Sequence, residues 1–129
     1  MVTSVSSGIL ANTGHLLENL VFIALRRIYP QIYYYRTKSG REVDFIVPCP
    51  DHSQMLIQVC ESLVDVRTRK RETTALTEAM SELNKKTGFI VTKNDSEQID
   101  FENGLIEVVP IWRFLLDHTE YVVGAITTD

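Results

Sequence analysis

The sequence predicts an α/β domain with three layers, in which helices cover both faces of a central mixed sheet. Three observations support this prediction: apolar residues at helical spacing near the start, several short strand patterns, and a helical pattern between two of those strands. A helix that joins two strands of one sheet makes them parallel, whereas strands joined by tight turns are antiparallel. With 129 residues, the chain has the size of one domain.

The domain is expected over residues 13–117. A disordered or partly ordered lead-in over residues 1–12 precedes it, and a tail over residues 118–129 follows it. The lead-in lacks hydrophobic periodicity, and the tail shows no pattern with a clear role. The sequence contains no internal repeat and no linker, so one domain is expected.

The first helix is expected over residues 14–28. Asn12 and Thr13 supply side-chain oxygens that can accept from the free amides of the first turn, and Pro30 ends the helix. Its apolar stripe consists of Leu17, Leu20, Val21, Ala24, Leu25 and Ile28. This spacing places the stripe on one face, which we expect to pack on the sheet.

Three strands are expected next, over residues 32–36, 42–47 and 55–61. The first two form a hairpin, because Gly40 lies at the tip of a polar turn between them. In the second strand, Val43, Phe45 and Val47 are expected on one face, and Glu42, Asp44 and Ile46 on the other. In the third, Met55, Ile57 and Val59 alternate with Leu56, Gln58 and Cys60.

The second half of the chain completes the layers. A helix is expected over residues 67–85, a buried strand over 88–92, and a hairpin with strands 99–101 and 105–109 about Asn103-Gly104. Pro110 begins a last helix, because proline fits the first helical turn. The expected order is therefore an α-β-β-β-α-β core followed by a hairpin and a helix.

Composition indicates an ordinary globular chain. It has 44% hydrophobic and 23% charged residues and a formal net charge of −4, so bulk charge does not favour nucleic-acid binding. Cys49 and Cys60 lack metal-type spacing and are expected to be reduced. With neither a spanning apolar stretch nor a secretory leader, a cytoplasmic location without membrane contact is expected. No G-x-x-x-x-G-K-[S/T] pattern occurs, so no nucleotide is expected.

The strongest candidate site lies on two adjacent strands. Asp44 and Gln58 offer oxygen ligands from neighbouring positions, and Glu18 on the helix packed against them offers a third. Three such oxygens would suit Mg²⁺, which could assist phosphodiester hydrolysis. The thiol of Cys60 supplies neither a cation nor a hard ligand.

Each candidate also has a structural explanation. Asp44 could instead pair with Arg36 or Arg41, and Cys60 could be simple core packing. The basic run 67–71, with Arg67, Lys70 and Arg71, could contact phosphate or could be a solvated helix start.

Several motifs together resemble a known family. They are Gly14-His-Leu-Leu-Glu-Asn-Leu-Val21, Tyr34-Tyr-Arg-Thr-Lys-Ser-Gly-Arg-Glu-Val-Asp-Phe-Ile-Val47 and Leu56-Ile-Gln-Val-Cys60. They resemble the C-terminal domain, of undefined function, of a prokaryotic AAA-type ATPase family. That domain in turn resembles the PD-(D/E)XK nuclease superfamily, with its restriction-endonuclease-like fold. The resemblance runs from about residue 12 to residue 117 and does not include the ATPase module.

The resemblance implies roles for individual residues. Glu18 matches the acidic residue of the helix, Asp44 the metal-binding aspartate and Gln58 the acid-or-glutamine position, whereas Cys60 stands where the superfamily has lysine. Some active members move that lysine to the next helix. There, the buried stripe of Leu76, Ala79, Met80 and Leu83 continues backward through Thr73, Glu72 and Arg69, which favours Arg69 over Lys70. Arginine could stabilise phosphate charge but is a poor proton acceptor.

Three functional hypotheses follow. The first is a non-catalytic, nuclease-like accessory domain of an AAA-type ATPase that binds nucleic acid or a protein partner. The second is an active magnesium-dependent nuclease with a displaced basic residue. The third is a structural interaction module in which Glu18 and Asp44 pair with arginines. The missing lysine and the acidic net charge favour the first over the second, and the choice between the first and the third stays open.

Overall fold

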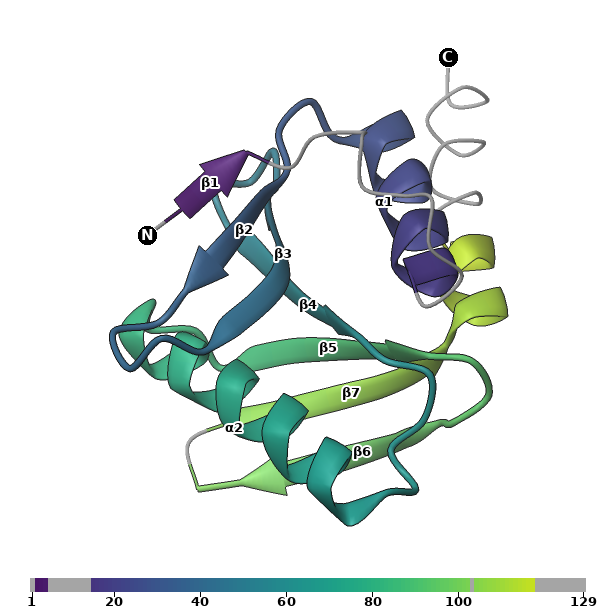
Figure 1. The fold of residues 1–129 in the computed structure, drawn as a ribbon. Helices are drawn as coiled ribbons and strands as arrows, with labels where there is room; N and C mark the ends of the chain where they lie inside the picture. Colours follow the sequence, from purple (N-terminus) through teal and green to yellow (C-terminus); the bar gives the residue numbers. More distant parts are fainter. Residues whose placement is uncertain (1, 5–14, 103, 118–129) are drawn as a thin grey trace.

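The computed structural model describes residues 2–4, 15–102 and 104–117, and it confirms an α/β fold with a mixed sheet between helices (Figure 1). The helices are α1 (Leu16–Ile28) and α2 (Val66–Glu82), and residues 111–117 are also helical. The strands are β1 (Val2–Ser4), β2 (Tyr33–Arg36), β3 (Glu42–Pro48), β4 (Gln54–Val59), β5 (Thr87–Thr92), β6 (Glu97–Phe101) and β7 (Gly104–Pro110).

Within the described residues, these strands form one sheet in the order β1-β2-β3-β4-β5-β7-β6. Strands β1 to β4 pair antiparallel, β4 pairs parallel with β5, β5 pairs parallel with β7, and β6 pairs antiparallel with β7. The helix between β4 and β5 therefore makes the predicted crossover. Edge strand β1 lies in the expected lead-in, where the sequence pattern gave no sign of a strand. The predicted turn residue Asn103 lies outside the described residues.

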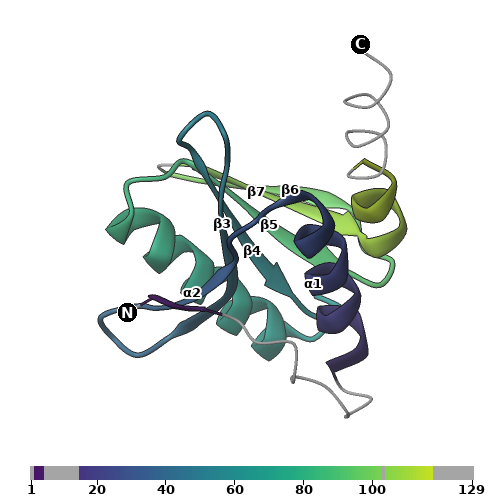
Figure 2. The same ribbon diagram turned by 90° about the horizontal axis from the view of Figure 1, so that it is seen from above.

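Two hydrophobic cores lie on opposite faces of the sheet (Figures 1 and 2). One packs α1 and the helical segment 111–117 against the sheet, with Leu25 and Phe114 buried. The other packs α2, with Leu76 and Met80 buried. The order of buried and exposed residues on α1 differs from the predicted stripe, because Phe22 is buried while Leu20 is 39% exposed. The predicted capping residues of this helix lie outside the described part of the chain.

A β-bulge interrupts β3. Its pairing with β2 shifts between Tyr33↔Ile46 and Tyr35↔Val43, so Asp44 and Phe45 together lie opposite a single residue of β2. As a result, Val43 and Ile46 belong to the core under α2, whereas Phe45 belongs to the core under α1. The predicted grouping of Val43 with Phe45 on one face was wrong, since an extra residue in one strand reverses the alternation beyond it. The predicted alternation of β4 has no such break.

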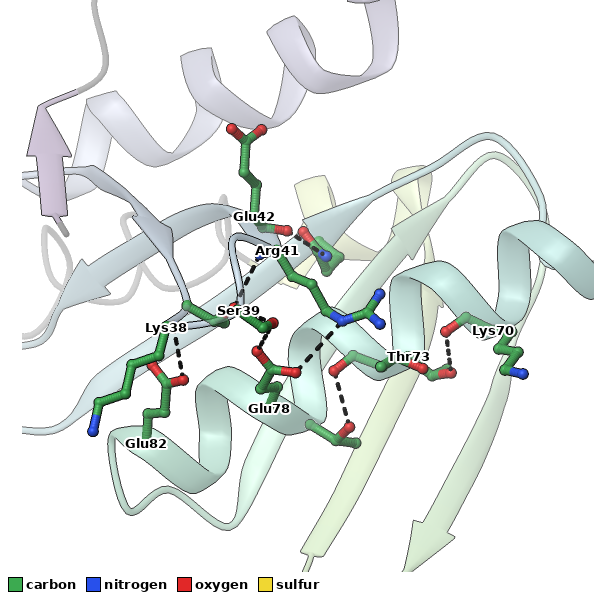
Figure 3. Close-up of polar contacts among 12 residues, drawn as sticks. Lys38, Ser39, Arg41, Glu42, Lys70, Thr73, Glu78 and Glu82 are labelled. Carbon is green, nitrogen blue, oxygen red and sulfur yellow. Dashed lines mark hydrogen bonds and ion pairs between the residues drawn. The ribbon is translucent and has the colours of Figure 1, made fainter.

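The turn between β2 and β3 is held to the C-terminal half of α2 (Figure 3). Glu78 accepts a hydrogen bond from the Ser39 hydroxyl and forms an ion pair with Arg41, 3.5 Å from Nε. Glu82 accepts from the backbone amide of Lys38 at 3.0 Å. We call this group of contacts the clamp. It joins two elements far apart in the sequence and therefore stabilises the tertiary arrangement rather than either element alone.

Among the described helices, none has the length and apolar character required to cross a membrane.

Candidate functional site at the junction of strands β3 and β4

The backbone pairing of β3 and β4 ends where the candidate site begins. The paired residues run from Pro48↔Gln54 to Phe45↔Ile57. Beyond this point, side chains replace the backbone ladder: the Asp44 amide donates to Gln58 Oε1 at 2.9 Å, and Gln58 Nε2 donates to the Glu42 carbonyl at 3.1 Å. The Val59 amide donates to Asp44 Oδ2 at 2.7 Å. We call Asp44 and Gln58, with these three bonds, the splint.

The splint explains how polar groups are tolerated here. Gln58 is 1% exposed, and both ends of its amide are hydrogen-bonded to the backbone of β3. Such a buried amide is inexpensive when both its donor and its acceptor have partners. The structure therefore brings Asp44 and Gln58 together as the sequence predicted. Oxygen atoms of both side chains, which were expected to face a metal, instead accept hydrogen bonds between the two strands.

The electrostatic surroundings of Asp44 are unfavourable to its charged form. Burial raises the pKa of Asp44 well above its usual range, and the charges of Glu18, Glu72 and Glu42 raise it further, while the bond from the Val59 amide lowers it. The arginines considered as partners pair elsewhere: Arg36 with Glu42 at 2.6 Å and Arg41 with Glu78.

Glu18 approaches from α1, on the other side of the junction from α2. Its Oε2 lies 3.2 Å from His15 Nδ1, and its charge acts on both Asp44 and Glu72. The two glutamates come from different helices, so only the tertiary structure brings these three acidic residues within electrostatic reach of one another.

Glu72 is a member of this cluster that the motif comparison missed. It lies in the second turn of α2, and burial raises the pKa of its carboxyl while neighbouring Arg71 lowers it. The side chain is 14% exposed, and its Oε1 lies 3.6 Å from Arg71 Nη2. The sequence did carry a signal, because the apolar stripe of α2 continues backward through position 72.

Cys60 lies directly after β4 and is partly buried. Burial, with the charges of Glu72 and Asp44, raises the pKa of its thiol to about 12. A thiol with such a pKa stays protonated at neutral pH, which makes it a poor nucleophile and a poor metal ligand.

The described side chains do not form a ready-made metal site. No group of three or more His, Cys, Asp or Glu side chains within residues 2–4, 15–102 and 104–117 has an arrangement that could hold a metal ion. The donor set agrees with this, since Gln58 Oε1 and Asp44 Oδ2 already accept backbone hydrogen bonds. Magnesium binding here thus stays a prediction.

The predicted basic residues separate into two groups. Arg69 donates from both terminal nitrogens to the carboxylate of Glu97 on β6, at 2.9 and 2.7 Å. Of the predicted basic residues, Arg71 lines a cavity together with Cys60, and Lys93 lines that cavity as well. Arg67 and Lys70 are exposed at the start of α2, and their charged groups form no ion pair with any described residue.

Two hollows adjoin the junction. A polar cavity of about 550 Å³ lies between the start of α2 and the loop after β5. The residues that line this cavity alone are Ser62, Thr68, Arg71, Asn94 and Asp95. An apolar groove of about 330 Å³ lies beside α1, lined by Leu16, Leu17, Glu18, Leu20, Val59 and Ile111. The two hollows share Cys60, Glu61 and Lys93.

Comparison with known proteins places the chain in a family. A family model described as "Domain of unknown function (DUF4143)" matches residues 13–114. An uncharacterized protein of Methanocaldococcus jannaschii is 34% identical over 119 residues, which are 83% of this chain and 26% of the relative. The chain thus spans about a quarter of the length of that relative. No solved structure matches. Since this family model matches most of the length of the chain, the chain belongs to the DUF4143 family.

Proposed function

We propose that this chain is a non-catalytic, nuclease-like module that binds nucleic acid on behalf of an AAA-type ATPase. The observation that carries the proposal is the splint. By resemblance, Asp44 and Gln58 match the metal-binding positions of PD-(D/E)XK nucleases. Their side chains nevertheless form hydrogen bonds that bridge the backbones of β3 and β4. Cys60 stands in place of the lysine, and its protonated thiol supplies no charge.

The basic start of α2 supports nucleic acid as the ligand. Arg67 and Lys70 have exposed charges without a described ion-pair partner, and Arg71 directly follows Lys70. Cations at a helix N-terminus are unfavourable to the helix, because the helix dipole already places positive charge there. A bound phosphate would reverse this cost, since it would interact favourably with the dipole and with the side chains.

The proposed association with an ATPase rests on the family resemblance and on the length of the relative. The relative in Methanocaldococcus jannaschii is about four times as long as the aligned stretch, so such a protein has room for further domains. A non-catalytic module would then bind the nucleic acid on which the ATPase domain acts.

A combined binding and cleavage assay tests this function. We expect the chain to bind labelled single-stranded DNA or RNA with an affinity that falls with salt, with a logarithmic slope of about −2 to −3. Exchange of Arg67 and Lys70 for glutamine should reduce both affinity and slope, whereas the matched exchange of Lys85 and Lys86 should change them little. No cleavage is expected with magnesium or manganese.

The alternative is an active magnesium-dependent nuclease, and the mutual influence of Glu18, Asp44 and Glu72 favours it, because a divalent cation would relieve their repulsion. Metal-dependent cleavage that disappears in both Asp44→Ala and Glu18→Ala would establish this alternative and remove the non-catalytic proposal. Cleavage that appears only in Cys60→Lys would support the proposal, since it would locate the missing chemistry at that position.

A further inference from the structure

The polar cavity and the apolar groove adjoin each other, since three residues line both, and we call the two hollows together the cleft. Their shared residues follow the parallel strands, because Cys60 comes directly after β4 and Lys93 directly after β5. The cleft runs from α2 on one face of the sheet to α1 on the other. Ligands of open α/β sheets bind at this place, outside the carboxyl ends of parallel strands.

The walls of the cleft are held by backbone bonds. The Cys60 amide donates to the Val91 carbonyl at 3.0 Å, and the Lys93 amide donates to the Glu61 carbonyl at 3.0 Å. Asp95 Oδ2 accepts from the Leu63 amide at 2.8 Å and from the Ser62 hydroxyl at 3.2 Å. The cleft is therefore preformed, and the carboxylate of Asp95 is already occupied in connecting its two loops.

The polar half offers donors for a phosphate group. Arg71 and Lys93 contribute positive charge, and Thr68 and Asn94 contribute a hydroxyl and an amide. The ammonium group of Lys93 forms no ion pair with a described residue, and Arg71 makes a long pair with Glu72 at 3.6 Å. Lys93 and Arg71 thus offer two positive charges to an anion in the polar cavity, although Arg71 also lies beside Glu72.

The other half offers an apolar surface with acceptors at its edge. Leu16 and Leu20, on successive turns of α1, are 60% and 39% exposed, and Ile111 lies on the facing helical segment. Glu18 and Glu61, which carry carboxylates, also line this half. A flat apolar group with hydrogen-bond donors on its edge, such as a nucleobase, matches these surroundings.

From these two halves we infer that the cleft holds one unpaired nucleotide, with the base in the apolar groove and its phosphate in the polar cavity. The two volumes, about 330 and 550 Å³, are sufficient for a nucleotide. A paired base is enclosed in its stack and cannot enter such a cleft. The inference deepens the proposed function and rests on it, because it names single-stranded nucleic acid as the substrate class.

Binding of short labelled strands by the full chain tests the inference. We expect a single strand to bind at least about tenfold more tightly than the corresponding duplex, and a nucleoside monophosphate to compete. Lys93→Gln and Leu20→Ser should each weaken single-strand binding about fivefold. Their controls are Lys38→Gln, on the distant turn after β2, and Ile23→Ser, which is 47% exposed on α1 but outside the groove. Trp112, the single tryptophan of the chain, follows groove residue Ile111, so its fluorescence should change on binding.

The outcomes separate the inference from the function on which it rests. If single strand and duplex bind equally, or if Lys93→Gln and Leu20→Ser behave like their controls, the cleft is not the nucleotide site, although nucleic-acid binding stands. If no nucleic acid binds to a folded chain, both the inference and the proposed function fail. Loss of affinity in both cleft variants with unchanged controls supports the inference.

Discussion

The two halves of α2 place carboxylates in opposite situations. In the C-terminal half, the hydroxyl of Ser39 and that of Tyr35 donate to Glu78 and Glu82, and these bonds lower the pKa of each glutamate. In the N-terminal half, burial raises the pKa of Glu72, and burial also raises the pKa of Asp44 across the junction. The same residue types thus belong to the clamp at one end and to an acidic junction at the other.

This difference distinguishes carboxylates that stabilise the fold from carboxylates that indicate a candidate functional site. Carboxylates that receive hydrogen bonds stabilise the fold, whereas buried carboxylates close to other negative charges reduce the free energy of unfolding. Perturbed acidic groups beside a cavity are typical of functional sites, although structural networks can also produce them. The clamp therefore accounts for the position of the hairpin on α2. A ligand would change the free energy of unfolding more at the junction than at the clamp.

The largest expected effect is at the splint. Gln58→Met keeps the volume of the side chain but leaves the Asp44 amide and the Glu42 carbonyl without their partners. We expect the free energy of unfolding to fall by about 3 kcal/mol, since each buried group left unsatisfied costs about 1–3 kcal/mol. Urea denaturation measures it, with Gln98→Met on the exposed edge strand β6 as control. A loss no larger than that of the control would show that the splint is not needed for folding.

Asp44→Asn should have the next largest effect and the opposite sign. Asparagine can still accept from the Val59 amide, and it removes a charge that the junction disfavours. Because folding raises the pKa of Asp44, the stability contributed by its protonated form is complete below the unfolded value of about 3.9 and is lost as pH rises through the folded value. The variant should equal the wild type in acid and exceed it by roughly 1–2 kcal/mol at neutral pH.

Urea denaturation of both proteins over a pH series measures this difference. The clamp contributes equally to both proteins: the stability from Glu78 and Glu82 is lost as pH falls through their lowered pKa values, and it cancels in the comparison. A variant less stable than the wild type at neutral pH would mean that the charged form of Asp44 has a stabilising partner, such as a bound cation.

The smallest expected effect concerns a hydrogen bond beside the clamp, which shares Glu82 with it. Tyr35 donates to Glu82 at 2.6 Å, and this bond is the main reason that the pKa of Tyr35 is raised to about 12. In Glu82→Gln, the pKa should return toward the ordinary tyrosine value of about 10. Spectrophotometric titration in the ultraviolet follows the change, and Glu78→Gln serves as control. If Tyr35 titrates alike in all three proteins, the bond to Glu82 does not set its pKa.

Most of the fold could be predicted from local patterns. The helical repeat before Pro30, the glycine turn at Gly40 and the apolar run at 88–92 each depend on residues close together in the chain, and each element lies within a few residues of its predicted range. The bulge at Asp44 and Phe45 was missed because it is defined by pairing with β2, which no local pattern records.

The site could be predicted in part. Asp44 and Gln58 were expected as neighbours, because the register of two short strands joined by a loop restricts which residues meet. The position of Arg69 could not be predicted in this way, since its carboxylate partner Glu97 is 28 residues away and its direction depends on how α2 lies across β6. The helical repeat indicated that Glu72 faces inward, but its proximity to Glu18 depends on how α1 and α2 pack in the folded chain.

The sequence by itself determined the α/β class, the order of the elements from α1 onward and the pairing of Asp44 with Gln58, because these follow from periodicity, turns and short-range register. Only the tertiary structure decided what those two side chains do. Where β3 and β4 separate, unpaired backbone groups need partners, and the nearest side chains provide them. The charges around them come from α1 and α2, so only the folded chain sets the electrostatics of the junction.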